Sequence, residues 1–410
     1  MNVDYDLLII GGGAVGASLA CALGGQGLRI GLIEARPFPA TEPVDYDARS
    51  LALAYGTQRI FAGLALWEML RPTVTPILKV HISERGSPGF ARLDCREEGV
   101  EALGYVVEAT HLNAALAARL NTLQSVDLWC PARLEDVTVQ REAAHATLRL
   151  SDQTVRLTAR LLVAADGASS RVRQQLGIAA LRWDYGQAAV IANVTPERNH
   201  HHVAYERFTE TGPVALLPLS QGRCAVVYTI ERAKQNAFLA LDDRAFLANL
   251  QTYFGERLGN FQRIGQRQCY PLLLVKSREH ARHRVAVIGN AAHTLHPVAG
   301  QGFNVGIRDV AALTDVITHA QQTGQDFGEL TVLNRYADWR RWDQRRSIIF
   351  TDGLVRLFTN PWLKPARHLG LLAFDLFPPA KHFLARQTMG LAGYLPRLAR
   401  GLPPAGRQTE

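Results

Sequence analysis

Three glycines near the amino terminus constrain this chain more than any other feature of its sequence. Gly11, Gly13 and Gly16 follow the apolar run Tyr5–Ile10 in the spacing G-x-G-x-x-G, and a helix is predicted to start near Ala14. In this spacing the first glycine permits a tight turn, the second lets the backbone approach a pyrophosphate, and the third lets the helix pack against the strand. The sequence therefore predicts a Rossmann-type strand–turn–helix unit that binds a dinucleotide.

An acidic residue at the expected distance supports this prediction. The run from Arg29 to Glu34 indicates a second strand, and Glu34 at its end is placed to grip a ribose hydroxyl. The helix after the glycines would aim its N-terminal N–H groups and its dipole at the phosphates. A glycine-rich turn without a ligand is the alternative, but the strand, the helix and the distal acid together favour the dinucleotide.

The same region is apolar enough to suggest a membrane span. Residues 7–28 contain no charged side chain, a length that could cross a bilayer. The glycine cluster at 11–13 and the change from a strand pattern to a helix pattern argue against that interpretation. Asp4 and Asp6 precede the run, unlike the basic start of a signal peptide. We therefore expect neither a signal peptide nor a transmembrane helix.

A second segment that could contact a cofactor follows another apolar run. Asp166 and Gly167 come directly after Leu161–Ala165, which indicates a buried strand. Ligands of open α/β sheets gather where such strands end. Arg171 and Arg173 follow closely and could balance phosphate charge. An Asp-Gly pair alone is a common turn. Its value as evidence for a ligand site depends on the preceding strand and the following arginines.

The third segment is Gly289–Pro297, which continues into Gly300–Asn304. Asn290 follows a predicted strand and could bond a ribityl hydroxyl. Pro297 and Gly302 would let the backbone lie against a flat ring, and a helix from about Asn304 would favour a reduced, anionic flavin. The order and spacing of the three segments predict one bound dinucleotide, FAD.

The histidines and cysteines do not indicate a metal or a disulfide framework. His293 and His296 stand three apart, but no third ligand has suitable spacing, so no metal site is predicted. The five cysteines are scattered and include no C-x-x-C pair. A reducing cytoplasm is the compartment that this usage favours.

The 410 residues are long enough for two or three domains. Strand and helix signals alternate at both ends, and long β-type runs occupy the middle. We predict an α/β fold with three parts: a discontinuous FAD-binding domain (1–75, 97–180 and 276–345), an inserted, largely antiparallel substrate-binding sheet (76–96 and 181–275), and a helical C-terminal region (346–410).

The net charge of +8 comes from the C-terminal part of the chain. Residues 331–410 hold 13 Lys and Arg against 5 Asp and Glu, which accounts for the whole excess. A basic, apolar tail suits an anionic membrane surface or a protein partner. An ordinary helical bundle with arginines facing water fits equally well. Nucleic-acid binding is disfavoured because no recognised reading module accompanies the charge.

Taken together, the three segments resemble the fingerprints of class A flavoprotein aromatic hydroxylases, the group typified by para-hydroxybenzoate hydroxylase. More narrowly, the chain resembles the ubiquinone-biosynthesis hydroxylases. Arg49, in the run 47–53, corresponds to a flavin-contacting arginine of that family. Most of the family has Gly-Asp where this chain has Gly289 and Asn290. The Gly-Asn pair of this chain, together with the runs 82–86, 205–208 and 212–218, is similar to the octaprenyl-methoxyphenol hydroxylase branch.

The resemblance implies an FAD-dependent monooxygenase that uses NAD(P)H and O2 to hydroxylate the ring of a polyprenyl-methoxyphenol through a flavin C4a-hydroperoxide. NAD(P)H would bind transiently, because only one G-x-G-x-x-G is present. No residue is assigned to activate the phenol, and Tyr205 and Pro218 are pocket candidates. The predicted cofactor-binding residues are Gly11, Gly13, Ala14, Gly16, Glu34, Arg49, Asp166, Gly167, Asn290, Pro297, Gly302, Phe303 and Asn304.

The resemblance also implies partners. They are a lipophilic prenylated phenol, other ubiquinone-biosynthesis proteins, a peripheral contact with the inner face of a membrane, and a homo-oligomer. Three alternatives remain open at this point. The chain could be another ubiquinone-pathway or soluble-phenol hydroxylase, a flavin dehydrogenase or oxidase, or a non-catalytic partner whose flavin binding Asn290 has weakened.

Overall fold

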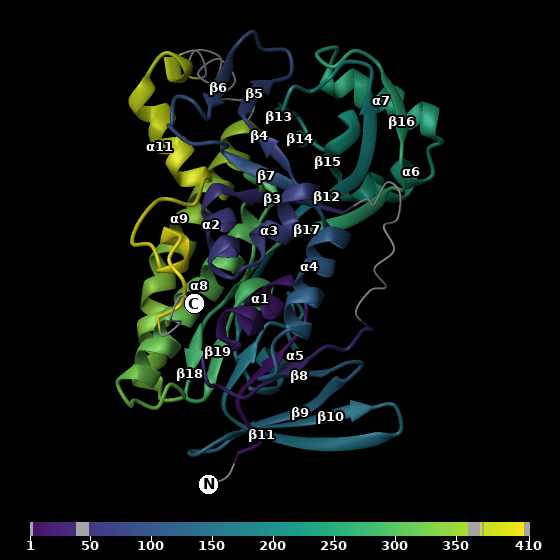
Figure 1. The fold of residues 1–410 in the computed structure, drawn as a ribbon. Coiled ribbons are helices and arrows are strands. Elements are labelled where there is room, and N and C mark those ends of the chain that lie inside the picture. The colour runs from purple at the N-terminus through teal and green to yellow at the C-terminus, as the bar shows by residue number, and fades with distance from the viewer. Residues whose placement is uncertain (1–2, 38–48, 360–369, 371–372, 406–410) are drawn as a thin grey trace.

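The computed structural model describes residues 3–37, 49–359, 370 and 373–405 (Figure 1). A mostly parallel sheet forms one end of the molecule and a larger, mostly antiparallel sheet forms the other. Helices cover the parallel sheet and one face of the larger sheet. This arrangement confirms the predicted α/β fold with an inserted, largely antiparallel sheet.

The first sheet has eight strands. Its parallel core runs in the order β19-β11-β1-β2-β8, β18 flanks β19, and β10 and β9 extend it beside β11. Because helices or further strands cover both faces, β1 is apolar along nearly its whole length instead of alternating. The strand bounds are β1 Tyr5–Ile10, β2 Ile30–Ile33, β8 Val126–Trp129, β9 Arg133–Val139, β10 Ala144–Leu150, β11 Gln153–Ala164, β18 Ala281–Arg282 and β19 Val285–Val287.

The second sheet has nine strands in the order β20-β17-β12-β15-β14-β13-β5-β6, with β16 beside β12. All of its pairs are antiparallel except β13 with β5. Thus the segment from 76 to 96 supplies β5 and β6 to a sheet built mainly from residues 180–277. The bounds are β5 Lys79–Glu84, β6 Phe90–Asp94, β12 Ala180–Pro196, β13 Val203–Thr209, β14 Gly212–Pro218, β15 Cys224–Glu231, β16 Phe261–Ile264, β17 Gln268–Ser277 and β20 His293–Thr294.

A small third sheet, β3-β7-β4, lies between the two larger ones. Its strands are β3 Ser50–Ala54, β7 Gly104–Glu108 and β4 Thr75–Ile77. Buried Ile77 and Val106 of this sheet pack against Ala204 and Ala225 of the nine-stranded sheet. This contact holds the two larger sheets together from one side.

The helices pack mainly against the parallel sheet. Helix α8 is the most deeply buried of the long helices, because it is enclosed by α1, α2, α9 and β3. The described helices are α1 Ala14–Leu23, α2 Tyr55–Gly63, α3 Trp67–Leu70, α4 Ala109–Asn121, α5 Arg171–Gln175, α6 Gln235–Leu239, α7 Asp243–Phe254, α8 Gln301–Gln322, α9 Leu330–Thr359 and α11 Pro378–Thr388. Helix α9 runs unbroken through residue 346, where the sequence predicted the C-terminal region to start.

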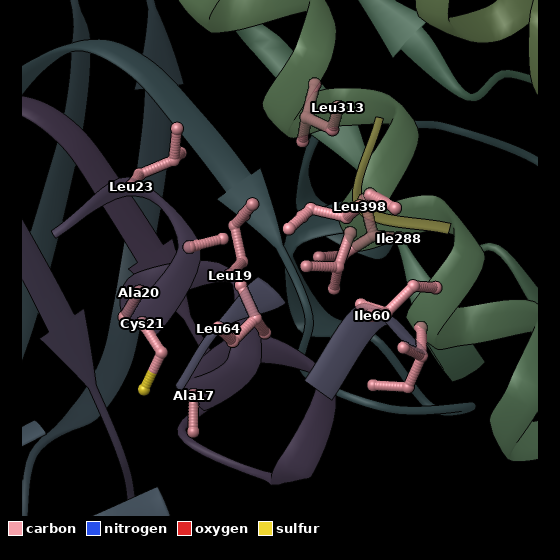
Figure 2. Close-up of a cluster of buried hydrophobic side chains, with 14 of the residues drawn as sticks. Ala17, Leu19, Ala20, Cys21, Leu23, Ile60, Leu64, Ile288, Leu313 and Leu398 are labelled. Atoms are coloured by element: carbon pink, nitrogen blue, oxygen red, sulfur yellow. The ribbon is translucent and has the colours of Figure 1, made fainter. Parts of the chain in front are cut away.

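Figure 2 shows how segments far apart in the chain build one core. Side chains of α1 meet those of α2 and α8, and the C-terminal Leu398 packs among them. The labelled residues of this cluster are Ala17, Leu19, Ala20, Cys21, Leu23, Ile60, Leu64, Ile288, Leu313 and Leu398. The C-terminal part of the chain is therefore partly integrated into the cofactor domain.

No helix in the described ranges is both long enough and apolar enough to cross a bilayer. The uncharged stretch 7–28 forms β1, the glycine turn and α1. All five cysteines are free thiols.

Candidate cofactor-binding and active site

The three glycine-containing segments converge at the carboxyl edge of the parallel sheet. Ile10 of β1 pairs with Ala164 of β11, and Ala164 pairs with Val287 of β19, so the three strands end at the same level. The chain leaving each strand then carries one of the predicted segments. Ligands of open α/β sheets bind at this edge, where the strand order reverses.

Close backbone contacts fix how these segments meet. A Cβ on Gly11 would lie 2.4 Å from the carbonyl oxygen of Ala165, and a Cβ on Gly16 would lie 1.9 Å from the carbonyl oxygen of Gly11. Only glycine fits at either position. At Gly13, by contrast, no atom lies within 4 Å of an added Cβ. Gly13 therefore faces open space at the N-terminus of α1, where a pyrophosphate would lie.

Glu34 follows β2 at the same edge. Its Oε2 accepts a hydrogen bond from the Gly12 N–H at 2.8 Å, and its Oε1 accepts one from the Arg36 N–H at 2.9 Å. Each carboxylate oxygen keeps a second lone pair for a ribose hydroxyl. Glu34 thus holds the glycine turn in place as well as lying where the sequence predicts a ribose ligand.

Asp166 has one oxygen engaged and one without a partner. Its Oδ2 accepts from the Val172 N–H at 3.1 Å, while its Oδ1 is buried and has no hydrogen-bond partner among the described residues. Such a buried acceptor carries a desolvation cost unless a ligand or a water satisfies it. Gly167 beside it has open space at its Cβ position. This half-satisfied turn fits a cofactor group.

The two arginines after Asp166 have protein partners. Arg171 donates to the carbonyl of Leu134 at 3.0 Å, and Arg173 is buried and donates to the carbonyl of Ala168 at 2.7 Å. Burial lowers the pKa of Arg173, and the nearby Asp166 carboxylate opposes that shift. The structure therefore gives both guanidinium groups roles in holding the Asp166 turn and its surroundings.

The third segment is anchored from α8. The Gly289 N–H donates to Oδ2 of Asp309 at 2.9 Å, and Asn290 next to it is exposed at the sheet edge. Helix α8 starts at Gln301, three residues before the predicted start, because Gly300 with φ +60° forms the N-cap. No side chain caps this helix. The N–H groups of Gly302 and Phe303, in the first turn of α8, therefore precede the first i→i−4 hydrogen bond of the helix and point toward a ring lying beside Pro297.

Asn304 contributes differently from the prediction. Its Oδ1 accepts from the Ala54 N–H at 2.8 Å and the Thr57 hydroxyl at 2.7 Å, and its Nδ2 donates to the carbonyls of Ala52 and Gly300. All four hydrogen-bonding positions of the amide are used within the protein. The Asn304 side chain therefore clamps β3 and α2 to the start of α8, and none of its hydrogen-bonding positions is left for a cofactor.

Arg49 lies directly before β3 and is exposed. Its carbonyl accepts from the Ala109 N–H at 2.9 Å. Because Asn304 ties β3 to α8, Arg49 is carried toward the third segment. Residues 47 and 48, which begin the run that resembles the family, lie outside the described residues.

A buried ionic network behind the third segment was not predicted. Asp309 accepts from His293 Nε2 at 2.7 Å, from Arg340 Nε at 2.6 Å and from Gln344 Nε2 at 3.1 Å. Burial alone would raise the pKa of Asp309, but His293 and Arg340 hold it well below its usual range. Among the described residues, no group of three or more His, Cys, Asp or Glu side chains is placed to hold a metal ion. The spacing of the two histidines could not reveal these partners.

His296 points to the other domain. Its Nδ1 accepts from the Val298 N–H and its Nε2 lies 3.3 Å from Oε1 of Gln187 in β12, so the proton resides on Nε2. The ring also makes an edge contact with Tyr185, with centroids 5.2 Å apart. Burial lowers the pKa of His296 to about 4. A neutral histidine thus connects the third segment to the nine-stranded sheet.

A second link between the domains is an ion pair. Arg223, before β15, donates to both carboxylate oxygens of Glu108 at 3.0 and 3.1 Å. Both side chains are buried. Glu108 ends β7, so this bidentate pair fixes the nine-stranded sheet against the small third sheet.

The predicted pocket candidates lie on the far face of the nine-stranded sheet. Tyr205 packs against the cluster covered by α7, with its ring 5.6 Å from that of Phe254. Pro218 has the same parity as Val214 and Leu216 and pairs with Cys224, which belongs to that cluster. Successive side chains of a strand point to opposite faces, so Tyr205 and Pro218 both lie on the sheet face that α7 covers and not on the face that meets the third segment.

The opposite face of this sheet approaches the third segment. Phe208 contacts Val298 there. Ile191, Leu217 and Val227 share this face and stay only half-buried, whereas Val190, Leu216 and Val226 on the α7 face are fully buried. The half-buried residues form an apolar wall on the sheet face that contacts the third segment at Phe208.

The fold and site define a class: a flavoprotein in which a dinucleotide-binding sheet meets a separate substrate-binding sheet at a shared loop. A family model described as an FAD binding domain matches residues 4–341. A ubiquinone hydroxylase of Rhodospirillum rubrum, UbiL, is 39% identical over 405 residues, covering 97% of this chain and 93% of that protein. The 3-demethoxyubiquinol 3-hydroxylase of Escherichia coli is 30% identical over 394 residues, covering 95% and 100%.

Solved structures support the same fold. The p-nitrophenol 4-monooxygenase PnpA from Pseudomonas putida superposes with a TM-score of 0.79 over 95% of this chain and 99% of that one, at 18% identity. The chain belongs to the FAD-binding family and, within it, to the ubiquinone-biosynthesis hydroxylases. It is an FAD-dependent monooxygenase, with O2 as co-substrate and NAD(P)H as electron donor.

Proposed function

We propose that this protein hydroxylates the aromatic ring of a polyprenyl-methoxyphenol on the pathway to ubiquinone. The observation that carries the proposal is the half-buried apolar wall of Ile191, Leu217 and Val227, on the sheet face that contacts the third segment at Phe208. Apolar side chains in the middle of a sheet are normally fully buried, as their neighbours on the α7 face are. Such a wall suits a ring that carries a prenyl chain.

The chain's own residues would bind and orient the reactants. The N–H groups at the start of α1 would hold the pyrophosphate, and those at the start of α8 would stabilise negative charge on the ring. Bound FAD supplies the redox chemistry that activates dioxygen. His296 and the Glu108–Arg223 pair would keep the apolar wall closed against the cofactor edge and so exclude water.

The ring position is the finer part of the proposal. The Escherichia coli relative is named for hydroxylation at position 3 of a demethoxyubiquinol. The methoxyphenol substrate for this chain therefore rests on the sequence resemblance. We further propose that the protein works with other enzymes of the pathway, as a homo-oligomer, and in peripheral contact with the membrane that holds its lipophilic substrate.

The test is aerobic NADPH turnover by the FAD-loaded protein with a short-chain prenyl-methoxyphenol, followed by mass spectrometry of the product. We expect one oxygen atom from labelled O2 on the ring. Hydroxylation of a demethoxyubiquinol instead would reassign the position. NADPH oxidation that yields only peroxide would reject this substrate, and an absence of NADPH oxidation with FAD bound would reject the monooxygenase reaction.

A further inference from the structure

We propose that one edge of the nine-stranded sheet docks on the surface of an anionic lipid bilayer. This docking edge consists of Leu376, Phe377, Phe383, Arg85, Arg207 and Arg257. The inference rests on the proposed function, because an enzyme whose substrate carries a prenyl chain must reach the membrane that dissolves it. It adds the surface that makes this contact.

The apolar part of the docking edge lies at the start of α11. Leu376 is 82% exposed, Phe377 is 58% exposed and Phe383 is 71% exposed. Leu376 and Phe377 directly precede the first residue of α11, and Phe383 lies within its second turn. Three large apolar side chains this close together and open to water mark an interaction surface.

The other face of α11 is fixed to the protein, so Phe383 is held outward. Lys381 pairs with Glu97 at 2.9 Å, and Nδ1 of His382 lies 2.7 Å from Glu98. Ala385 is buried one turn after Lys381. The outward direction of Phe383 therefore follows from contacts on three other positions of the same helix.

Direct contacts join this apolar part to strand β6. Asp375 accepts from the Arg92 N–H at 2.8 Å, and its carboxylate lies 3.5 Å from the Arg92 guanidinium. Arg92 also lies over the ring of Phe90 at 4.8 Å, and Phe90 lies 5.5 Å from the ring of His81. The surface is therefore continuous from α11 through β6 to β5.

The basic part lies at the far side of β5, next to the end of α7. The Arg85 guanidinium lies over the ring of Tyr253 at 4.5 Å, and its acidic contact, Glu210 at 3.4 Å, is 63% exposed. An ion pair so exposed is weak, so a lipid phosphate could replace Glu210 beside Arg85. Arg207 has no acidic partner among the described residues, and its buried Nε lacks a hydrogen-bond acceptor there. Arg257 is exposed.

The local electrostatics agree with an excess of positive charge. Burial lowers the pKa of Arg207, and Arg257 and Arg85 lower it further. Burial, Arg257, Arg92 and Arg207 together lower the pKa of His81 to about 4. The carboxyl end of α7 favours one nearby cation, which does not account for three. Lipid phosphates would supply the missing negative charge.

The combination of exposed apolar side chains and unneutralised arginines selects a bilayer surface over a soluble anion. Apolar groups enter the boundary between headgroups and acyl chains, while arginines attract anionic lipids. In Figure 1, α11, β5, β6 and α7 lie at one end of the molecule, and β9, β10 and β11 lie at the opposite end. The opposite end therefore offers matched control positions.

The test is co-sedimentation of the full-length, FAD-loaded protein with vesicles of phosphatidylcholine, with and without phosphatidylglycerol. We expect binding only with phosphatidylglycerol, weakening as salt rises. Arg85→Gln with Arg257→Gln should weaken partitioning by roughly 25-fold, from a factor of five for each arginine. Phe377→Ser with Phe383→Ser should weaken it by roughly tenfold or more.

Two control variants make corresponding changes at the opposite end, one to two exposed arginines and the other to an exposed apolar residue. Arg133→Gln with Arg156→Gln, and Leu128→Ser, alter exposed positions on β8, β9 and β11. We expect both to bind vesicles like the wild type. Flavin absorbance and circular dichroism confirm that each variant is folded, and all should turn over a water-soluble short-chain phenol normally.

Several results would overturn the docking edge. They are equal binding to neutral vesicles, equal losses in the control variants, or saturable binding of inorganic phosphate without vesicle binding. A change in molecular mass by light scattering in the docking variants would identify the edge as a contact between two copies of the chain instead. Vesicle binding with the expected variant losses but no phenol hydroxylation would retain the docking edge and reject the proposed substrate.

Discussion

The carboxylate of Asp309 and the imidazole of His293 lie 2.7 Å apart, and neither side chain is exposed. The same carboxylate holds the Gly289 N–H and the buried Arg340. One buried side chain of α8 therefore fixes the cofactor-binding turn after β19 and the position of α9. The third fingerprint therefore depends on α8 and, through Arg340, on α9, which crosses the boundary predicted between residues 345 and 346.

Asp309→Asn should destabilise the protein by about 3 kcal/mol, because it removes one of the two buried carboxylates that pair with Arg340, the other being Asp343. FAD should also dissociate more readily, since the Gly289 turn loses its anchor. Denaturant unfolding and flavin release measure the two effects. Asp338→Asn is the control, because within the described part of the chain Asp338 forms only an exposed pair with Arg341. Equal stability of the two variants would contradict the role given to Asp309.

Gly16→Ala and Gly13→Ala should separate folding from cofactor binding. An added Cβ at Gly16 would overlap the carbonyl oxygen of Gly11, so Gly16→Ala should fail to fold normally. At Gly13 the Cβ meets nothing, and α1 should form as before. The added Cβ at Gly13 would instead occupy the space of the pyrophosphate and weaken FAD binding roughly tenfold or more. Circular dichroism and FAD titration give the two readouts, and unchanged affinity in Gly13→Ala would reject the pyrophosphate position.

Asn304→Ala should destabilise the fold by about 2–4 kcal/mol, because it leaves the Ala54 N–H and the Thr57 hydroxyl without their buried acceptor. Asn334→Ala, at an exposed position of α9, should change stability by no more than about 0.5 kcal/mol. Thermal or urea unfolding compares the two. If Asn304→Ala lost FAD affinity without losing stability, its side chain would be a direct ligand and not a clamp.

Stability should fall as the pH drops from about 6.5 to 4. Burial lowers the pKa values of His280 and His296 to about 4. Over this range the unfolded chain takes up a proton at each histidine while the folded protein does not, so the free energy of unfolding declines by about 1.4 kcal/mol per pH unit for each. Urea unfolding at several pH values measures the slope.

His296→Asn should reduce that slope by about 1.4 kcal/mol per pH unit, the contribution of one proton. The Oδ1 of the introduced asparagine can still accept from the Val298 N–H, so only the titrating group is lost. Identical slopes in the variant and the wild type would show that His296 is not held neutral.

Tyr205→Phe should leave kcat/KM within about a factor of two, because Tyr205 faces α7. Ile191→Ala should raise KM for a prenylated phenol by about 10-fold or more, since removing apolar groups from a pocket costs about 1–3 kcal/mol. Steady-state NADPH oxidation with a short-chain substrate compares them. A large loss in Tyr205→Phe with none in Ile191→Ala would place the pocket on the other face of the sheet.

The sequence by itself determined the elements whose physics is local. The glycine spacing from Gly11 to Gly16, the strand before it and the acid at Glu34 each depend on neighbours in the chain, and β1 and α1 begin where these signals predict. Asp166 and Asn290 were found in the same way, because each follows a short apolar strand. Because the ends of parallel strands lie at one edge of a sheet, the three separate segments together predicted one cofactor site.

The tertiary structure alone decided which side chains serve the site and which support it. Asn304 bonds to residues about 250 positions away, and Asp309 joins turns and helices whose approach no spacing rule encodes. Tyr205 shows the same limit on a sheet, because the face that a strand turns toward the cofactor depends on which face α7 covers. Local patterns specify backbone conformation, whereas burial and hydrogen-bond partners depend on packing between segments distant in the chain.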